Sequence, residues 1–411
     1  MQSAQSFIDA TLARSHQLDQ RSPLLARERG SSAAELVRRG IPSGKLETWK
    51  YTPIQEFFAP PFADAEAPTT EHRRGDLFLS FSGTTAIPIR GSTPDVSAVS
   101  PAHGVSIATL GSGTTGHAPL NSGIDVERYP LAHLNTALLE DALVITIAPG
   151  VDAGALDLRF ASGPNAANVS RVCIELGAGS RLTLVEQRAE DLPTNSVITI
   201  RVGARAKFEH TRVLPATVPP CWHLLSVHVD VEGSYALVGH AMGSRTRRSD
   251  VHVKLDGHHA TTNIDLACAV RGHDRLDHQV VVEHIGVDTV SRQIVHGIAA
   301  DSSELTFNGR IHIHPNAQRS DARLTNKNLL LDRRARINTK PELEIYANDV
   351  KCSHGATVGQ IDPAQIFYLR TRGLDEITAR AMLTRAFLAS RLTPWMLDAG
   401  VLGIYAELFS S

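Results

Sequence analysis

Cysteine is scarce in this chain, with four residues among 411. The four are far apart and form no CxxC pair, which argues against a disulfide framework and against a closed, cysteine-rich zinc site. So few thiols suit a reducing compartment, and we therefore expect a cytoplasmic protein. The cysteines are Cys173, Cys221, Cys268 and Cys352.

Long apolar runs and a strong charge imbalance are also missing. No apolar stretch reaches the roughly eighteen residues of a transmembrane helix. The first twenty residues, about the length of a signal peptide, lack its apolar core. The formal charge is −2, so we expect neither nucleic acid nor a membrane as a partner.

The motifs of several common enzyme classes are absent. There is no GxxxxGK[ST], so this chain is not expected to hydrolyse ATP through a P-loop. We find no GxSxG and no HExxH. Acidic residues are dispersed rather than gathered in one segment. We therefore predict a protein that is not itself an enzyme.

What the sequence does contain is a repeated strand-and-turn unit. From about residue 131, short runs of β-branched and apolar residues alternate with turns of small or polar residues. Turns near positions 300, 315, 332 and 348 are 15 to 17 residues apart. This regularity predicts a mainly β protein with a parallel β-helix, or β-solenoid, in which one or two units form a coil. An antiparallel sandwich is the alternative, but hairpin turns such as Asn-Gly are few.

Helical patterns lie at both ends of the chain. We predict an N-terminal helical and irregular region over 1–95, the β-helix core over 96–361 and a C-terminal helical domain over 362–411. Asp362 is expected to cap the first C-terminal helix. The next, over 374–392, is apolar on more than one side, so this domain either caps the solenoid or docks another protein.

One cysteine lies two positions from a histidine. In a strand, residues i and i+2 share a face, so Cys352 and His354 should be adjacent. Thiolate and imidazole both bind iron, zinc and copper. A site that used only this pair would need further ligands from elsewhere, including another chain. The alternative is a buried cysteine and a hydrogen-bonded histidine with structural roles, and the residues alone leave both open.

Two other histidine pairs follow a related pattern. His312 and His314 share one strand face, and His278 and His284 could meet through neighbouring coils. We interpret both pairs as histidines on a solvated sheet face rather than as metal ligands.

Three blocks of sequence carry a resemblance to a known family. The run KPELEIYANDVKCSHGATVGQIDPAQIFYLRTRG, at residues 340–373, resembles the C-terminal signature of the SufB/SufD family of iron–sulfur cluster assembly proteins. Residues 40–54 and 131–151 resemble two further family blocks. Gly355 follows His354 where SufB proteins tend to carry a carboxylate, so the chain is most similar to the SufD branch.

The resemblance implies a right-handed parallel β-helix between two helical regions. It implies pairing with SufB through the β-helices, so we expect the coils near 310–350 to contact SufB, with a homodimer possible in isolation. It also implies that the C-terminal helices bind the SufC ATPase, for which we select Met382 and Phe387 as contact residues.

The same resemblance implies a metal site and a role. His354 and Cys352 are expected at the SufB–SufD interface, where a nascent iron–sulfur cluster or iron is held, and SufD proteins are linked to iron supply. Reduced flavin is associated with the assembled complex, but this chain shows no flavin motif. The alternatives are a SufB-type homodimeric scaffold and a stand-alone β-helical carbohydrate-active enzyme.

Overall fold

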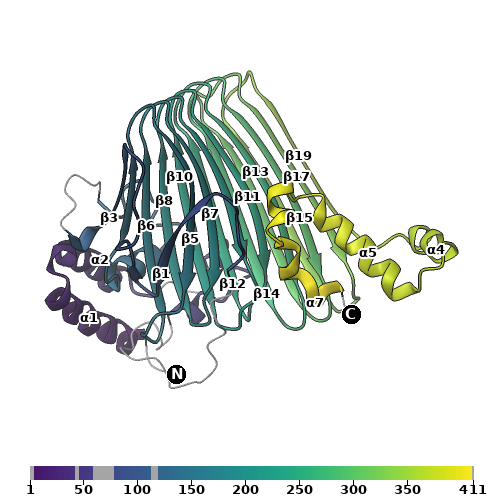
Figure 1. The fold of residues 1–411 in the computed structure, drawn as a ribbon, viewed down its shortest axis with the longest axis horizontal. Helices are drawn as coiled ribbons and strands as arrows, with labels where there is room; N and C mark the ends of the chain where they lie inside the picture. Colours follow the sequence, from purple (N-terminus) through teal and green to yellow (C-terminus); the bar gives the residue numbers. More distant parts are fainter. Residues whose placement is uncertain (1–3, 42–45, 59–77, 113–118, 410–411) are drawn as a thin grey trace.

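The computed structural model describes residues 4–41, 46–58, 78–112 and 119–409. Part of the family-like block at 40–54, residues 42–45, lies outside these described residues, as do residues 59–77 of the predicted N-terminal region. The fold is a parallel β-solenoid of about seven turns with helices at both termini (Figure 1). The predicted fold class is therefore confirmed.

Two sheets form the walls of the solenoid, and from β4 onward consecutive strands alternate between them. The first sheet contains β1 (Thr84–Arg90), β2 (Thr93–Pro94), β5 (Asp152–Ala161), β7 (Arg181–Ala189), β9 (Lys207–Leu214), β11 (Ser234–Met242), β13 (Thr261–Val270), β15 (Val290–Ala299), β17 (Asp321–Leu330) and β19 (Lys351–Gly359). The second contains β3 (Val105–Thr109), β4 (Leu143–Ile147), β6 (Asn168–Leu176), β8 (Thr194–Val202), β10 (Cys221–Val229), β12 (Arg247–Leu255), β14 (Arg275–His284), β16 (Glu304–Ile313) and β18 (Arg336–Ile345).

Each coil stacks on the next in parallel register. Thr261 of β13 pairs with Val290 of β15, and Arg275 of β14 pairs with Glu304 of β16. One coil therefore contains two of the strand-and-turn units seen in the sequence. Inward side chains of the two sheets meet in one continuous apolar core along the solenoid. At the N-terminal end the stacking changes, because β2 and β3 pair antiparallel with β1 and β4.

The corners that lead from the second sheet to the first use left-handed residues. Arg205, Glu232, His259, Asp288 and Arg319 have φ between 54° and 61°. At four of these corners, the N–H of the left-handed residue donates to a carbonyl of the next coil at 2.8 to 3.0 Å. Non-glycine residues seldom adopt this conformation, so the coil-to-coil hydrogen bonds compensate for its cost.

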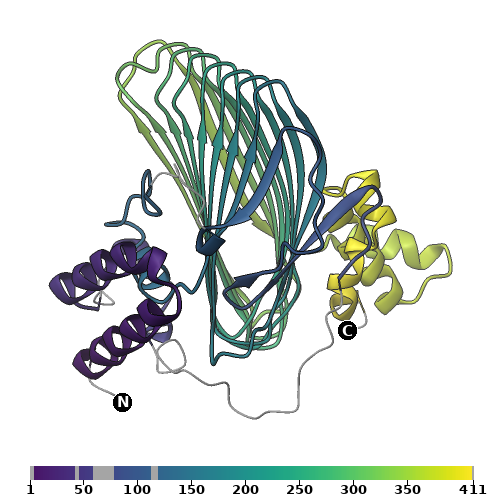
Figure 2. The ribbon, with the colours of Figure 1, turned by 60° about the vertical axis from the view of Figure 1, so that its left-hand side comes forward.

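The two helical regions cover opposite walls of the solenoid (Figure 2). Near the N-terminus, α1 (Ala4–Arg21), α2 (Ala26–Arg39) and α3 (Leu131–Ala137) pack on the outer face of the second sheet. At the C-terminal end, α5 (Glu376–Ala389) and α7 (Ala406–Phe409) pack on the outer face of β11, β13 and β15. The shorter α6 (Pro394–Asp398) packs beside β7 and β9.

The helix α4 (Pro363–Thr371) projects away from the solenoid (Figures 1 and 2). It begins where the sequence predicted, because the Asp362 carboxylate accepts a hydrogen bond from the N–H of Ala364 at 2.9 Å. Of the predicted domain boundaries, the one at 361–362 falls between β19 and α4, and the one at 95–96 falls just after β2.

Candidate functional site

Cys352 and His354 lie on β19, the last strand of the first sheet. In the register with β17, Cys352 is beside Ala322 and His354 is beside Leu324. Ala322 and Leu324 are buried in the apolar core, so both site residues have their side chains on the inner face. The shared face that the two-residue spacing predicted is therefore present, and it is the inner face of the terminal coil.

Within the described part of the chain no further coil stacks on β19, and the two side chains differ in exposure. Cys352 is half-buried and packs against the apolar core, whereas His354 is exposed. Burial, together with the nearby Asp321 carboxylate, raises the pKa of the Cys352 thiol to about 11. The thiol is thus protonated at neutral pH, and binding a metal would release its proton.

Polar side chains lie directly beneath this open end. Asn326 and Asn328 of β17 are buried next to Ala356 and Val358 of β19. The Asn326 amide oxygen accepts a hydrogen bond from the Thr339 hydroxyl at 2.8 Å, and the Asn328 amide nitrogen donates to the Thr357 carbonyl at 3.1 Å. These bonds tie the two terminal strands to the coil below and hold the site in place.

The strands at this end each have a free edge. The Lys351 N–H donates to Ser320 in the preceding coil at 2.9 Å. Because backbone groups alternate sides along a strand, the N–H groups of Cys352, His354, Ala356 and Val358 point to the free edge. In β18, the Arg336 N–H donates to Ser303 of the preceding coil. By the same alternation, position 341 faces the free edge of β18. This position is occupied by Pro341, which has no N–H to offer. The edge of β19 is therefore the more complete template for a further strand.

Met382 and Phe387, the predicted contact residues on α5, have different surroundings. Met382 is 55% exposed. Phe387 is half-buried, and its ring stacks on His296 of β15 with centroids 4.6 Å apart. Phe387 thus attaches the helical region to the solenoid, which leaves Met382 as the accessible member of the pair. Other apolar side chains are exposed on α4 and α5: Phe367, Tyr368 and Ile377.

The interpretation of His278 and His284 as surface residues was wrong. Both point into the solenoid and are at most 3% exposed. His278 Nδ1 lies 3.5 Å from the Cys268 sulfur, and His284 bonds to hydroxyls of Thr289 and Ser291. Burial lowers the pKa of His278 to about 3 and that of His284 to about 4, so both are neutral members of the core.

A buried ionic cluster inside the solenoid was not foreseen from the sequence. The Glu186 carboxylate binds Arg188 Nε and Arg212 Nε, each at 2.6 Å. His210 Nε2 is 3.4 Å from the same carboxylate, and its Nδ1 is 3.0 Å from the Tyr235 hydroxyl. Burial would raise the pKa of Glu186, but the two guanidinium groups hold it well below its usual value. Side chains alternate between the inner and outer faces along each strand. Once the register is known, the sequence therefore indicates that these polar residues point inward.

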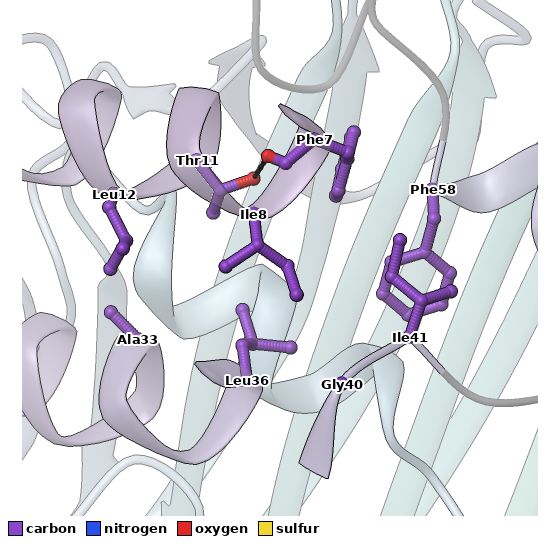
Figure 3. A pocket seen from close by; sticks show the side chains of 9 residues that line it. All are labelled: Phe7, Ile8, Thr11, Leu12, Ala33, Leu36, Gly40, Ile41 and Phe58. Atoms are coloured by element: carbon purple, nitrogen blue, oxygen red, sulfur yellow. Dashed lines mark hydrogen bonds between the residues drawn. The ribbon is translucent and has the colours of Figure 1, made fainter. Parts of the chain in front are cut away.

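An apolar pocket lies between α1 and α2 (Figure 3). Its lining includes Phe7, Ile8, Leu36 and Phe58, and its cavity volume is about 10 Å³. That volume is near the lower limit for one water molecule. We therefore regard it as a packing gap between helices rather than a ligand site.

Comparison with known proteins points to one family. The family model described as "SUF system FeS cluster assembly, SufBD core domain" matches residues 159–387. The iron–sulfur cluster assembly protein SufD of Escherichia coli is 30% identical over 380 residues, 89% of this chain and 88% of its own length. Protein ABCI7, chloroplastic, of Arabidopsis thaliana is 32% identical over 200 residues, 47% of this chain and 41% of its own. A SufBD family protein of Synechocystis is 29% identical over 224 residues, 54% of this chain and 49% of its own.

The fold and these matches define an assembly protein of the SUF system for iron–sulfur clusters. The chain belongs to the SufB/SufD family, and within it is most like SufD. Membership sets aside the stand-alone carbohydrate-active enzyme considered from the sequence. None of the described helices is long and apolar enough to cross a membrane.

Proposed function

We propose that this chain is the SufD-like subunit of a cytoplasmic SufB–SufC–SufD scaffold that contributes to iron acquisition and holds a nascent iron–sulfur cluster at the SufB–SufD interface. The observation that carries the proposal is the position of Cys352 and His354. Both side chains are on the inner face of the terminal coil, beside a free strand edge.

The site needs a partner because it offers too few ligands alone. Iron–sulfur clusters are usually held by about four protein ligands, and β19 provides one thiol and one imidazole. A homologous solenoid that pairs with the free edge would bring its own side chains to the same opening. The cluster is then cargo shared between two subunits. Reduced flavin in the assembled complex is part of the proposal, with no residue of this chain assigned to it.

Co-expression with SufB and SufC tests the proposal directly. We expect the three chains to co-purify, and light scattering to show a SufB–SufD pair in preference to a homodimer. A chain that remains monomeric and ignores SufB would contradict the proposal. A stable homodimer that does not exchange with SufB would favour the SufB-type homodimeric scaffold instead.

Replacing Ala356 by proline should block pairing through β19. The Ala356 N–H points to the free edge, so proline removes a donor needed by a partner strand but none of the hydrogen bonds to β17. Because proline leaves a carbonyl of the partner strand unpaired, at a cost of about 1–3 kcal/mol, recovery of SufB in a pull-down should fall about tenfold.

Ala356→Val is the matched control, because valine keeps the N–H and favours strands. We expect it to recover SufB at the level of the unmodified chain. Circular dichroism should be unchanged for both variants. Equal SufB recovery by Ala356→Pro and Ala356→Val would show that the interface does not use this edge.

Replacing Met382 by aspartate should weaken SufC binding at least about tenfold, since an unpaired carboxylate would be buried in an apolar contact. Met382 is 55% exposed on a helix that extends beyond the solenoid wall (Figure 1). The fold should be unaffected, and a pull-down with SufC measures the loss.

Val218→Asp provides the control, because Val218 is 74% exposed in the connection between β9 and β10. It should bind SufC normally. Phe387→Asp should instead release the C-terminal helices from His296 and increase their cleavage by protease. Full SufC binding by Met382→Asp would place the docking surface elsewhere.

A further inference from the structure

Glu283, His312 and His314 gather on the outer face of the second sheet. Each offers one ligand atom, and the three atoms lie within 4.8 Å of one another. The register places Glu283 of β14 directly beside His312 of β16, and His314 follows two residues later on the same face. All three side chains are half-buried. The cluster therefore combines one carboxylate and two imidazoles from adjacent coils.

The Glu283 carboxylate is held from two sides. Its Oε2 is 2.9 Å from His314 Nε2, and its Oε1 is 2.6 Å from His252 Nε2 on β12. His252 is 2% exposed. This buried imidazole fixes the orientation of Glu283, as buried partners of metal-binding carboxylates do.

The two imidazoles are arranged in parallel. The rings of His312 and His314 stack with centroids 4.1 Å apart and planes at 14°. Bonds of about 2.1 Å place ligand atoms roughly 3–4 Å apart, so side-chain movement of about 1 Å closes the set around an ion.

Cations near the cluster are already engaged. The Lys254 ammonium donates to the Gly123 carbonyl at 3.3 Å, and Arg310 pairs with Glu344 of β18. Glu344 Oε2 also lies 4.0 Å from His312 Nδ1. A metal bound here would thus have a second carboxylate, that of Glu344, at the rim of the site.

We propose that Glu283, His312 and His314 form a binding site for a divalent transition metal of the zinc or ferrous iron type. Two histidines and one carboxylate, with positions left open, suit these ions. The site is on the outside of the second sheet, whereas Cys352 and His354 face the interior of the first. It needs no SufB and no cluster, so it is independent of the function proposed above. It also revises the interpretation of His312 and His314 as ordinary surface histidines.

The test uses the untagged full chain, freed of metal with a chelator and titrated with Co²⁺. We expect one equivalent to bind with visible d–d absorption from nitrogen and oxygen ligands. Glu283→Gln and His314→Ala should each weaken binding at least about a hundredfold, and His252→Ala about 10- to 100-fold. Zn²⁺ should displace Co²⁺ from the unmodified chain.

Two controls separate this site from other histidines. A Cys352→Ala, His354→Ala double variant should keep the d–d bands, and His258→Ala, at an exposed corner, should bind as the unmodified chain. Melting temperatures of all variants without metal confirm folding. No binding by the unmodified chain, or equal binding by Glu283→Gln, would overturn the proposal and leave a hydrogen-bonded network. Bands that vanish only in the double variant would assign the metal to Cys352 and His354 instead, and would also overturn it.

Discussion

His354→Ala is expected to remove most in vivo cluster assembly while leaving the fold and the subunit complex intact. The imidazole lies on the inner face of the terminal coil, and it is exposed. Truncating an exposed side chain leaves no cavity in the core, so the structural cost should be small. The functional cost should be large, because Cys352 is then the one remaining proposed ligand from this chain among the residues that the structure describes.

Complementation of a strain that depends on this pathway measures the effect, with pull-down of SufB and SufC as the assembly control. Ser353→Ala is the matched variant, since Ser353 lies between the two site residues with its side chain on the opposite face. It should support growth fully. Cys352→Ala should impair growth less than His354→Ala, because an imidazole and partner ligands remain. Normal growth of the His354→Ala strain would mean that this histidine has a structural role only.

Glu186→Gln should produce the largest loss of stability among single substitutions in the solenoid core. The change leaves Arg188 and Arg212 buried without their shared carboxylate. Removing one partner of a buried ion pair typically costs about 3–5 kcal/mol. Chemical denaturation should show this as a lower midpoint, and hydrogen exchange should localise it to the coils around β7 and β9.

The same carboxylate makes a prediction about pH. Because the folded-state pKa of Glu186 lies well below its usual value, its stabilising contribution is present above the unfolded-state pKa and is lost as the pH falls. The Glu186→Gln variant should therefore lose less stability on acidification than the unmodified chain. Asp288→Asn is the control, since Asp288 pairs with Arg319 on the surface and asparagine tolerates its left-handed backbone. A similar loss in both variants would refute a special role for the buried cluster.

The solenoid could be predicted because its corners recur at nearly constant spacing. The left-handed residues Arg205, Glu232, His259 and Asp288 follow one another at intervals of 27 to 29 residues. Their chemical identity varies, however, and this explains the lack of the usual glycine-containing turn signals. The spacing of the corners can be predicted from the sequence, whereas the backbone conformation at each corner depends on hydrogen bonds to the next coil.

Neighbouring site residues on one strand could be predicted from the sequence. Contacts between residues on different coils could not. The shared face of Cys352 and His354 follows from two-residue alternation alone. Glu283 meets His312 only through the inter-coil register, which spacing in one strand does not specify. Likewise, the burial of Phe387 against His296 depends on where α5 crosses the first sheet.

The two ends of the solenoid differ in a way that limits the stacking of further copies. A stack of strands open at both ends could add copies without limit and form a filament. Here the N-terminal end finishes in β2 and β3, strands of two and five residues that pair antiparallel with their neighbours. The opposite end presents β19 in parallel register with a nearly complete set of outward backbone groups. One closed end and one open end allow this chain to form a pair and then stop.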